Sequence, residues 1–349
     1  MRQGVPVAEQ VFLDLSAEEQ SDILQTVAPQ LARGASVLEK DIWVCWTLQA
    51  LFSMPGTHPM AFKGGTSLSK VYGVIDRFSE DVDITLDYRA FDEGFDPFAE
   101  GVSRTKTKQF SDRLKSYVLA YATEVVVPYL ESELAKLPTA EQHTVELDDG
   151  GEKIWVTYPS VVEGTDEYIR SQVLIELGGR NVIDPNETHI VSPYIAELTQ
   201  GLVYPSSEVV VLSPERTFWE KATLIHVECN RGKLRESAER LSRHWYDLVM
   251  LSAHPAGQSA VENRELFEEV VRHKKVFFHT GYANYDACLD GRLKLLPETD
   301  TLESLRADYE KMVGAGMMYS TPPSFCSAAP GLAPCGVRFG TGLNVRFES

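Results

Sequence analysis

Two neighbouring stretches of sequence decide the fold: residues 60–70, MAFKGGTSLSK, and residues 77–87, RFSEDVDITLD. The first stretch predicts a short apolar strand that passes through a pair of glycines into a short helix. Because the first amides of a helix have no partners within it, a turn of this kind favours phosphate. The second stretch alternates polar and apolar residues with a period of two, which predicts a strand with one buried face.

Asp81 and Asp83 lie on the second stretch, where side chains two residues apart project from the same face of a strand. Two converging carboxylates suit a hard cation, and we expect Mg²⁺, with Mn²⁺ as the other choice. The alternative is a solvated acidic face, which is common in so acidic a chain. The turn that favours phosphate lies just upstream and supports the metal site, and the two features together indicate phosphoryl or nucleotidyl transfer.

Helices are predicted on either side of these stretches. The capping-box sequence Ser-Ala-Glu-Glu predicts a helix over residues 16–31, and a broad apolar stripe predicts a second helix over residues 36–52. A long helix is expected over residues 105–137, where Pro128 should kink or split it.

More strands and a helical half follow along the chain. Residues 143–147 and 154–158 flank the turn sequence Asp-Asp-Gly-Gly and predict a hairpin. Residues 172–177 predict a further strand, in which Glu176 is a lone acid among apolar residues. The Ser-Pro-Glu sequence at residues 213–215 is typical of a helix start, and the chain beyond it is mostly helical in pattern.

These patterns predict an α+β protein with four parts: an N-terminal helical segment, a core that carries the two opening stretches, a helical C-terminal domain and an irregular tail. The expected boundaries are residues 1–35, 36–212, 213–320 and 321–349.

Composition limits the partners and the compartment. The 349 residues carry a net charge of −18, so the average field of the protein repels phosphate chains and nucleic acid can bind only locally. The sequence has no apolar run long enough to cross a bilayer and does not open with the apolar stretch of a secretory signal. We therefore expect a cytoplasmic protein with no membrane partner.

The two opening stretches resemble the polymerase-β-like nucleotidyltransferase signature, a glycine turn followed after a helix by Asp-x-Asp on a strand. More narrowly, residues 62–70 and 77–84 resemble the AbiEii-type nucleotidyltransferase toxins of bacterial type IV toxin–antitoxin and abortive-infection systems, which serve in phage defence. Two later motifs match in order, Arg-Thr-Phe-Trp-Glu-Lys at residues 216–221 and Arg-His-Trp-Tyr-Asp-Leu at residues 243–248. The tail from residue 321 has no counterpart in the family.

The resemblance implies a polymerase-β-like core, a small mixed sheet with helices, followed by a helical C-terminal domain. It also implies transfer of a nucleoside monophosphate from a nucleoside triphosphate to an acceptor hydroxyl, with release of pyrophosphate. The implied acceptor is RNA, and more narrowly a tRNA 3′ end, and the implied partner is an antitoxin with a DNA-binding winged helix that neutralises the toxin.

Roles for single residues follow from the matched motifs. Asp81 and Asp83 would hold the metal, and Glu176 would polarise the attacking hydroxyl, unless Glu176 is an edge residue that faces water. Lys221 would neutralise triphosphate oxygens, against the alternative of an ordinary exposed lysine. Asp247 would orient Lys221 or a basic neighbour, or else it pairs with an arginine one helical turn earlier.

Two further groups of residues complete the predicted site. The residues expected to bind the nucleotide are Lys63, Gly64, Gly65, Thr66, Ser67, Ser79 and Lys221. The basic residues between the last two motifs, which would form either an RNA-binding surface or a solvated helix face, are Arg231, Lys233, Arg235, Arg240 and Arg243.

Two other functions remain open on the sequence. A nucleotidyltransferase that modifies a small-molecule hydroxyl, such as that of an antibiotic, suits an acidic protein, because acidic clefts attract cationic substrates. A catalytically silent module that binds a nucleotide or a partner is the other, because a fold does not fix an activity.

Overall fold

The computed structural model describes residues 10–91, 94–162, 170–231, 240–297, 299–315 and 317–325. The chain divides into two compact units. The first unit comprises Met1–Thr66, Ser79–Glu93 and Arg113–Val211, and the second comprises Ser67–Phe78, Gly94–Asp112 and Leu212–Ser349. The four-part division expected from the sequence stays a prediction.

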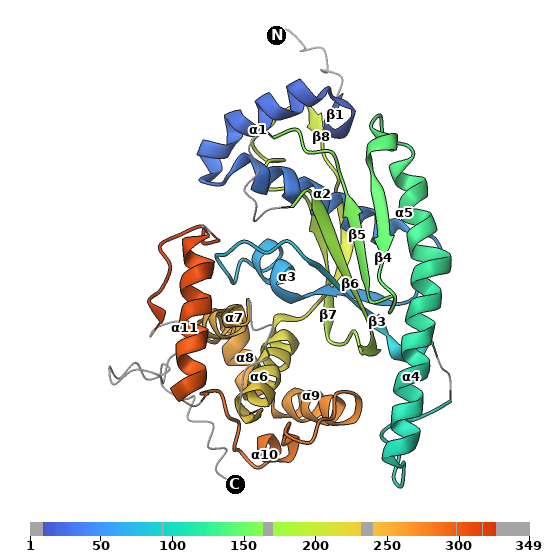
Figure 1. The fold of residues 1–349 in the computed structure, drawn as a ribbon, viewed down its shortest axis with the longest axis vertical. Helices are drawn as coiled ribbons and strands as arrows, with labels where there is room; N and C mark the ends of the chain where they lie inside the picture. The colour runs from blue at the N-terminus through green and yellow to red at the C-terminus, as the bar shows by residue number, and fades with distance from the viewer. Residues whose placement is uncertain are drawn as a thin grey trace, which may run out of the picture. The chain divides into compact units, whose positions relative to one another are not determined.

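A mixed sheet forms the centre of the first unit (Figure 1). Its central strand, β3, pairs antiparallel with β2 and parallel with β6. The strands in their order across the sheet are β4 (Thr144–Leu147), β5 (Lys153–Thr157), β6 (Gln172–Asn181), β3 (Val82–Asp87), β2 (Met60–Lys63), β9 (Ser207–Leu212) and β7 (Asn186–Val191). A separate parallel pair is formed by β1 (Gln10–Val11) and β8 (Leu202–Val203).

Helices cover one face of this sheet. The helix α2 (Ala35–Ser53) packs on β3 and β6, and α1 (Ala17–Leu31) packs on α2. The predicted capping box is present, because the Ser16 hydroxyl accepts the Glu19 amide at 3.3 Å and the Glu19 carboxylate accepts the Ser16 amide at 2.9 Å.

The predicted long helix is split. It consists of α4 (Arg104–Tyr121), one π-helical turn (Ala122–Val126) and α5 (Val127–Leu134). Pro128 lies at the start of α5, where a missing amide donor costs little. The short 3₁₀ helices are Phe12–Asp14, Tyr88–Ala90 and Ala140–Gln142.

The second unit is helical, and α6 lies at its centre with contacts to α7, α8, α9 and α10. Ser213 caps α6 by accepting the Arg216 amide at 3.2 Å, as the sequence predicts. The fully buried Trp219 donates its indole N–H to the Ala260 carbonyl at 3.0 Å. The helices are α6 (Pro214–Asn230), α7 (Ser242–Ala253), α8 (Pro255–Glu262), α9 (Arg264–Phe277), α10 (Tyr285–Leu289) and α11 (Thr299–Gly314).

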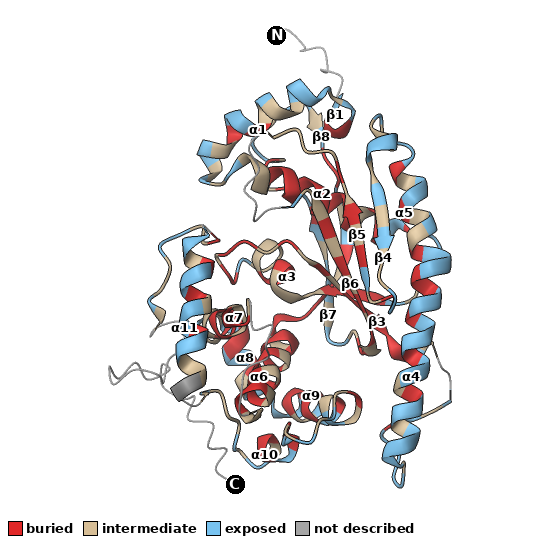
Figure 2. Ribbon diagram, viewed as in Figure 1, coloured by how far each residue is buried: buried red, intermediate tan, exposed pale blue. Residues whose placement is uncertain are grey.

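The predicted α+β class is confirmed: the chain combines a mixed sheet with many helices. The hairpin of β4 and β5 also forms as predicted. The expectation that β3 buries only one face was incomplete, because only its first residues alternate between buried and half-buried positions. Its last residues, from Ile84 to Asp87, are buried on both faces (Figure 2).

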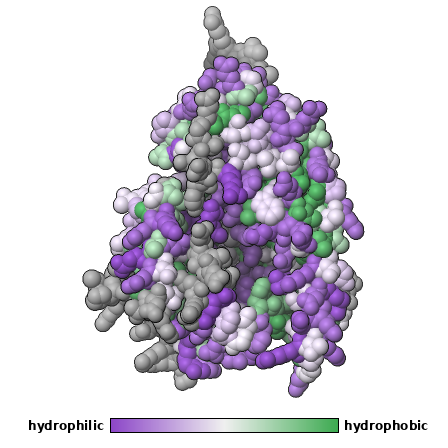
Figure 3. Space-filling model, in the orientation of Figure 1, coloured by the Kyte–Doolittle hydropathy of each residue, from purple (hydrophilic) through white to green (hydrophobic). Residues whose placement is uncertain are grey.

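The surface is mainly hydrophilic on the face drawn in Figure 3, in keeping with a chain in which 24% of the residues are charged. Within the described residues, no helix combines the length and the apolar character needed to cross a membrane.

Candidate functional site

The glycine turn and the acidic strand are in contact. Gly64, the first residue of α3 (Gly64–Lys70), has a φ of +83°, which favours glycine. A Cβ atom at this position would lie only 1.9 Å from Asp83 Oδ2. Gly64 therefore has two reasons to be a glycine, its backbone conformation and the carboxylate of Asp83 packed against it.

A hydroxyl group ties the same turn to the residues before β3. Thr66 Oγ1 donates a hydrogen bond to the Asp81 carbonyl at 2.6 Å and lies 2.9 Å from Ser79 Oγ. Thr66 and Ser67 are buried, with 2% and 0% of their surfaces exposed. The Thr66 side chain thus holds the turn in place from inside the protein.

Asp81 and Asp83 lie on one face of the strand segment. Both are half-buried, whereas Val82 and Ile84 between and after them are fully buried on the opposite face. The alternation is that of an extended chain, although β3 itself begins only at Val82, one residue after Asp81.

A row of charged residues crosses four strands at this level of the sheet. The register places Lys63 of β2 opposite Asp83, Asp83 beside Glu176 of β6, and Glu176 opposite Lys153 of β5. Lys153 Nζ lies 3.4 Å from Glu176 Oε1. The sheet therefore brings the predicted third acid next to Asp83, on the same face.

These residues fit a divalent cation. Among the described residues, no group of three or more His, Cys, Asp or Glu side chains is arranged to hold a metal by itself. Mg²⁺ does not require one, because it is usually held by one or two carboxylates together with water and substrate phosphates. Asp81 and Asp83 supply that donor set, and Gly64 leaves space beside the Asp83 carboxylate that any side chain would fill.

Lys221 and Asp247 meet in the second unit. Asp247 of α7 is fully buried, and its Oδ2 lies 2.8 Å from Lys221 Nζ of α6. The same carboxylate binds Arg77 through two hydrogen bonds, of 2.8 Å from Nε and 2.7 Å from Nη2. One buried anion thus holds two buried cations.

The two cations keep this carboxyl group ionised. Burial alone would raise the pKa of Asp247, but Arg77 and Lys221 outweigh burial and hold that pKa well below its ordinary range. The pKa of His244 is also lowered, well below its usual value, and here burial acts in the same direction as the nearby charges of Lys221 and Arg243. The ring is therefore neutral at physiological pH.

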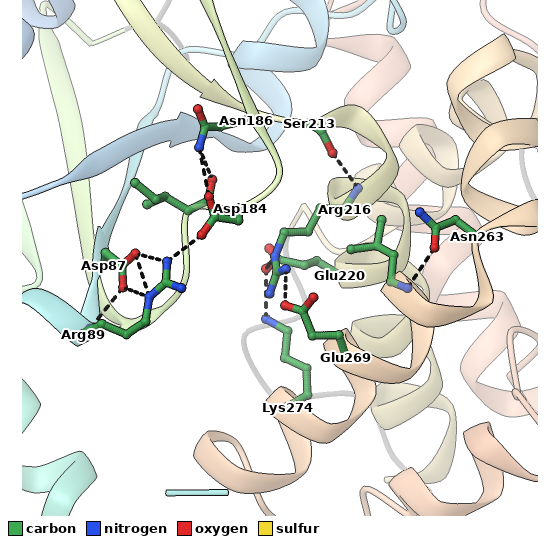
Figure 4. Close-up of polar contacts among 12 residues, drawn as sticks. Asp87, Arg89, Asp184, Asn186, Ser213, Arg216, Glu220, Asn263, Glu269 and Lys274 are labelled. Carbon is green, nitrogen blue, oxygen red and sulfur yellow. Dashed lines mark hydrogen bonds and ion pairs between the residues drawn. The ribbon is translucent and has the colours of Figure 1, made fainter. Parts of the chain in front are cut away.

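A third buried cation, Arg216, fixes the helix that carries Lys221 (Figure 4). Arg216 of α6 is fully buried, and its Nη1 bonds Glu269 of α9 at 2.8 Å. Glu220 lies 3.7 Å from both the Arg216 Nε and the Lys274 Nζ. These ion pairs join α6 to α9.

A further cluster, in the first unit, holds the end of β3 (Figure 4). Arg89 donates to Asp87 through Nε at 2.8 Å, and its Nη2 lies 2.5 Å from the Asp184 carboxylate.

The predicted RNA-binding residues are only partly described. Lys233 and Arg235 lie outside the described residues. Arg231 is half-buried, with its Nε 3.4 Å from Glu228 and its guanidinium 4.9 Å from the Tyr282 ring centroid. Arg240 and Arg243 are also half-buried, and the Arg240 amide donates to Asp308 at 2.7 Å. The predicted tail lies outside the description from residue 326 onward.

Sequence reasoning missed Arg77, Lys153 and Arg216. Arg77 begins the second opening stretch, but nothing in its local sequence indicates that it is 2% exposed and binds a residue 170 positions away. The sequence around Lys153 does not point to the site, because its position opposite Glu176 follows only from the pairing of β5 with β6. Arg216 lies just before the apolar residues Phe218 and Trp219 at a helix start. A charged residue beside such residues can be buried, and it then needs a partner of opposite charge.

Comparisons with known proteins identify the family. The family described as "Nucleotidyl transferase AbiEii toxin, Type IV TA system" matches residues 46–329. No curated protein matches the sequence. Among solved structures, MenT4, a nucleotidyltransferase toxin from Mycobacterium tuberculosis H37Rv, is 14% identical with a TM-score of 0.42, over 90% of this chain and 94% of that one. The family match covers most of the chain and confirms the resemblance and the enzyme class: the chain belongs to the AbiEii nucleotidyltransferase toxins of type IV toxin–antitoxin systems.

Proposed function

We propose that this nucleotidyltransferase uses Mg²⁺ or Mn²⁺, held by Asp81 and Asp83, to transfer a nucleoside monophosphate from a nucleoside triphosphate to an acceptor hydroxyl. The observation that carries the proposal is the contact of Asp83 with Gly64, with Glu176 beside Asp83 on the next strand. This contact supports the proposal, because it brings a carboxylate next to a turn whose amides favour phosphate.

Different residues of the first unit bind the cation, the triphosphate and the attacking hydroxyl. The cation, when bound, neutralises charge that develops on the leaving pyrophosphate. Lys63 and the amides at Gly64 and Gly65 bind triphosphate oxygens, while the buried Thr66 and Ser67 keep the turn in shape and Thr66 also holds Ser79. Glu176 accepts a hydrogen bond from the attacking hydroxyl and orients it, which is how a carboxylate acts as a general base.

The residues of the second unit supply positive charge. Lys221 neutralises triphosphate oxygens as a compact ammonium group. Asp247 fixes the position of Lys221 through their 2.8 Å contact, so Asp247 is a positioning residue rather than one that touches the substrate.

The acceptor that we propose is RNA, with a tRNA 3′ end as the first choice, and the basic residues from Arg231 to Arg243 are its proposed binding surface. Membership of a type IV toxin–antitoxin family supports a cognate antitoxin. We further propose that this antitoxin carries a winged helix, that the enzyme acts in the cytoplasm, and that its toxicity serves phage defence.

Labelling tests this proposal directly. The full-length protein is incubated with each α-³²P-labelled triphosphate, total RNA and Mg²⁺, with Asp81→Ala as the inactive variant. Asp149→Ala, which removes an exposed acid of the β4–β5 turn, is the matched control. We expect label in RNA for the wild type and for Asp149→Ala, and none for Asp81→Ala.

The same assay separates the other two functions. A cationic small-molecule acceptor is favoured by the net charge of −18, and label that enters only added small molecules would support it against RNA. Binding of a triphosphate without any transfer would support the silent module and refute the proposal.

A further inference from the structure

Three consecutive charged residues of α2 are buried. Glu39, Lys40 and Asp41 are only 4%, 3% and 7% exposed, and buried charges are costly unless each has a partner. Glu39 accepts the Val161 amide at 2.6 Å, and Asp41 accepts the Tyr194 amide at 2.7 Å. These two carboxylates therefore hold main-chain groups of connecting segments.

Lys40 differs, because it reaches toward the acidic strand. Its Nζ lies 2.5 Å from Glu80 Oε2 and donates to the Arg170 carbonyl at 3.0 Å. Glu80 is itself 8% exposed. The pair is thus a buried ion pair that joins α2 to the residue immediately before Asp81.

The segment from Ser79 to Asp81 is held from both of its faces. Ser79 and Asp81 are half-buried while Glu80 between them is buried, so the side chains alternate as in a strand. Thr66 binds Ser79 and the Asp81 carbonyl. Lys40 binds Glu80 on the other side, where α2 packs on β3 and β6.

We propose that the buried ion pair between Lys40 and Glu80 positions Asp81, so that metal affinity depends on two residues that do not touch the metal. This inference rests on the proposed function, in which Asp81 and Asp83 hold the cation. The physical reason is that outer partners fix the orientation of ligands, and their loss weakens metal binding.

Mn²⁺ affinity tests the proposal without any need for turnover. The free Mn²⁺ signal in electron paramagnetic resonance is measured against the full-length protein in the absence of nucleotide. We expect Lys40→Met and Glu80→Gln each to raise the Kd for Mn²⁺ about tenfold or more. Lys40→Arg, which keeps the cation, should recover most of the affinity.

Asp41→Asn is the matched control, since it weakens a neighbouring buried contact of the same helix that does not involve residues 79–81. It should lower the melting temperature but leave the Kd for Mn²⁺ unchanged. If Lys40→Met does not fold, Glu80→Gln alone decides the question, because it keeps the size of the side chain.

The outcomes separate this inference from the proposed function. Wild-type affinity in folded Lys40→Met and Glu80→Gln proteins overturns the inference alone, as does an equal loss in Asp41→Asn. A wild-type protein that binds no Mn²⁺ overturns the proposed metal site and the inference together.

Discussion

Replacing Arg77 with glutamine should destabilise the protein strongly. Arg77 makes two hydrogen bonds to Asp247, of 2.8 and 2.7 Å, and Asp247 has no exposed surface. Removing one partner of a buried ion pair costs about 3–5 kcal/mol. Because Lys221 still binds the same carboxylate at 2.8 Å, we take the lower end, about 3 kcal/mol.

That free energy converts into a measurable shift. The chain has 349 residues, and at about 2.1 cal/mol/K of unfolding entropy per residue a loss of about 1 kcal/mol lowers the melting temperature by roughly 1.4 °C, so Arg77→Gln should melt about 4 °C below the wild type. Differential scanning calorimetry of the full-length protein at pH 7 measures the shift. Arg77→Lys should fall between the two, because it keeps the charge but loses the second hydrogen bond.

An exposed ion pair of the same unit supplies the control. Arg264 is 45% exposed and bonds Glu268 one helical turn away at 2.9 Å, a type of pair that contributes about 0.3–0.5 kcal/mol. Arg264→Gln should therefore shift the melting temperature by about 1 °C or less. Equal shifts for Arg77→Gln and Arg264→Gln would refute the reasoning that burial makes the Asp247 pair strong.

Three other changes test the site. Gly64→Ala places a Cβ 1.9 Å from Asp83 Oδ2 and should abolish nucleotide transfer in the labelling assay. Gly56→Ala is the control and should remain active, because Gly56 also has a positive φ but has open space around it. Equal losses of activity in the two variants would contradict a role for the contact between Gly64 and Asp83. Glu176→Gln should lower kcat at least about tenfold with little change in KM, and an unchanged kcat would exclude Glu176 as the third acid. The pKa of Asp247 is lower in the folded protein than in the unfolded chain, so its ionised carboxylate stabilises the fold above the unfolded pKa of about 3.9, and this contribution is lost as the pH falls below that value. Melting temperatures measured down to pH 3 should therefore fall less steeply for Asp247→Asn than for the wild type. Parallel curves for the two proteins would contradict this.

Local patterns allowed the core of the candidate site to be predicted from the sequence. The alternation of Asp81 and Asp83 with Val82 is a property of neighbouring residues, and so is the glycine turn upstream. The caps at Ser16 and Ser213 are likewise set within one helical turn, and both form. Such features need no knowledge of which distant segments meet.

Pairings between distant residues could not be predicted in the same way. The motif match pointed to Lys221 as one partner of Asp247, and the two residues do pair, but the second partner, Arg77, lies 170 positions away and had no local signal. Lys40 and Glu80 meet only because α2 packs on the acidic strand. The strands β7 and β9 were missed, since β7 is largely polar and β9 follows a turn without a clear hairpin signal.

We propose above all that Asp81 and Asp83 hold a divalent cation next to the glycine turn. A crystal structure with Mn²⁺ and a non-hydrolysable triphosphate tests it most directly through the anomalous signal of the metal. We predict a peak at about 2.1 Å from a carboxylate oxygen of each aspartate, with the triphosphate against the amides of Gly64 and Gly65. A metal peak elsewhere, or a triphosphate bound away from this turn, would contradict the account.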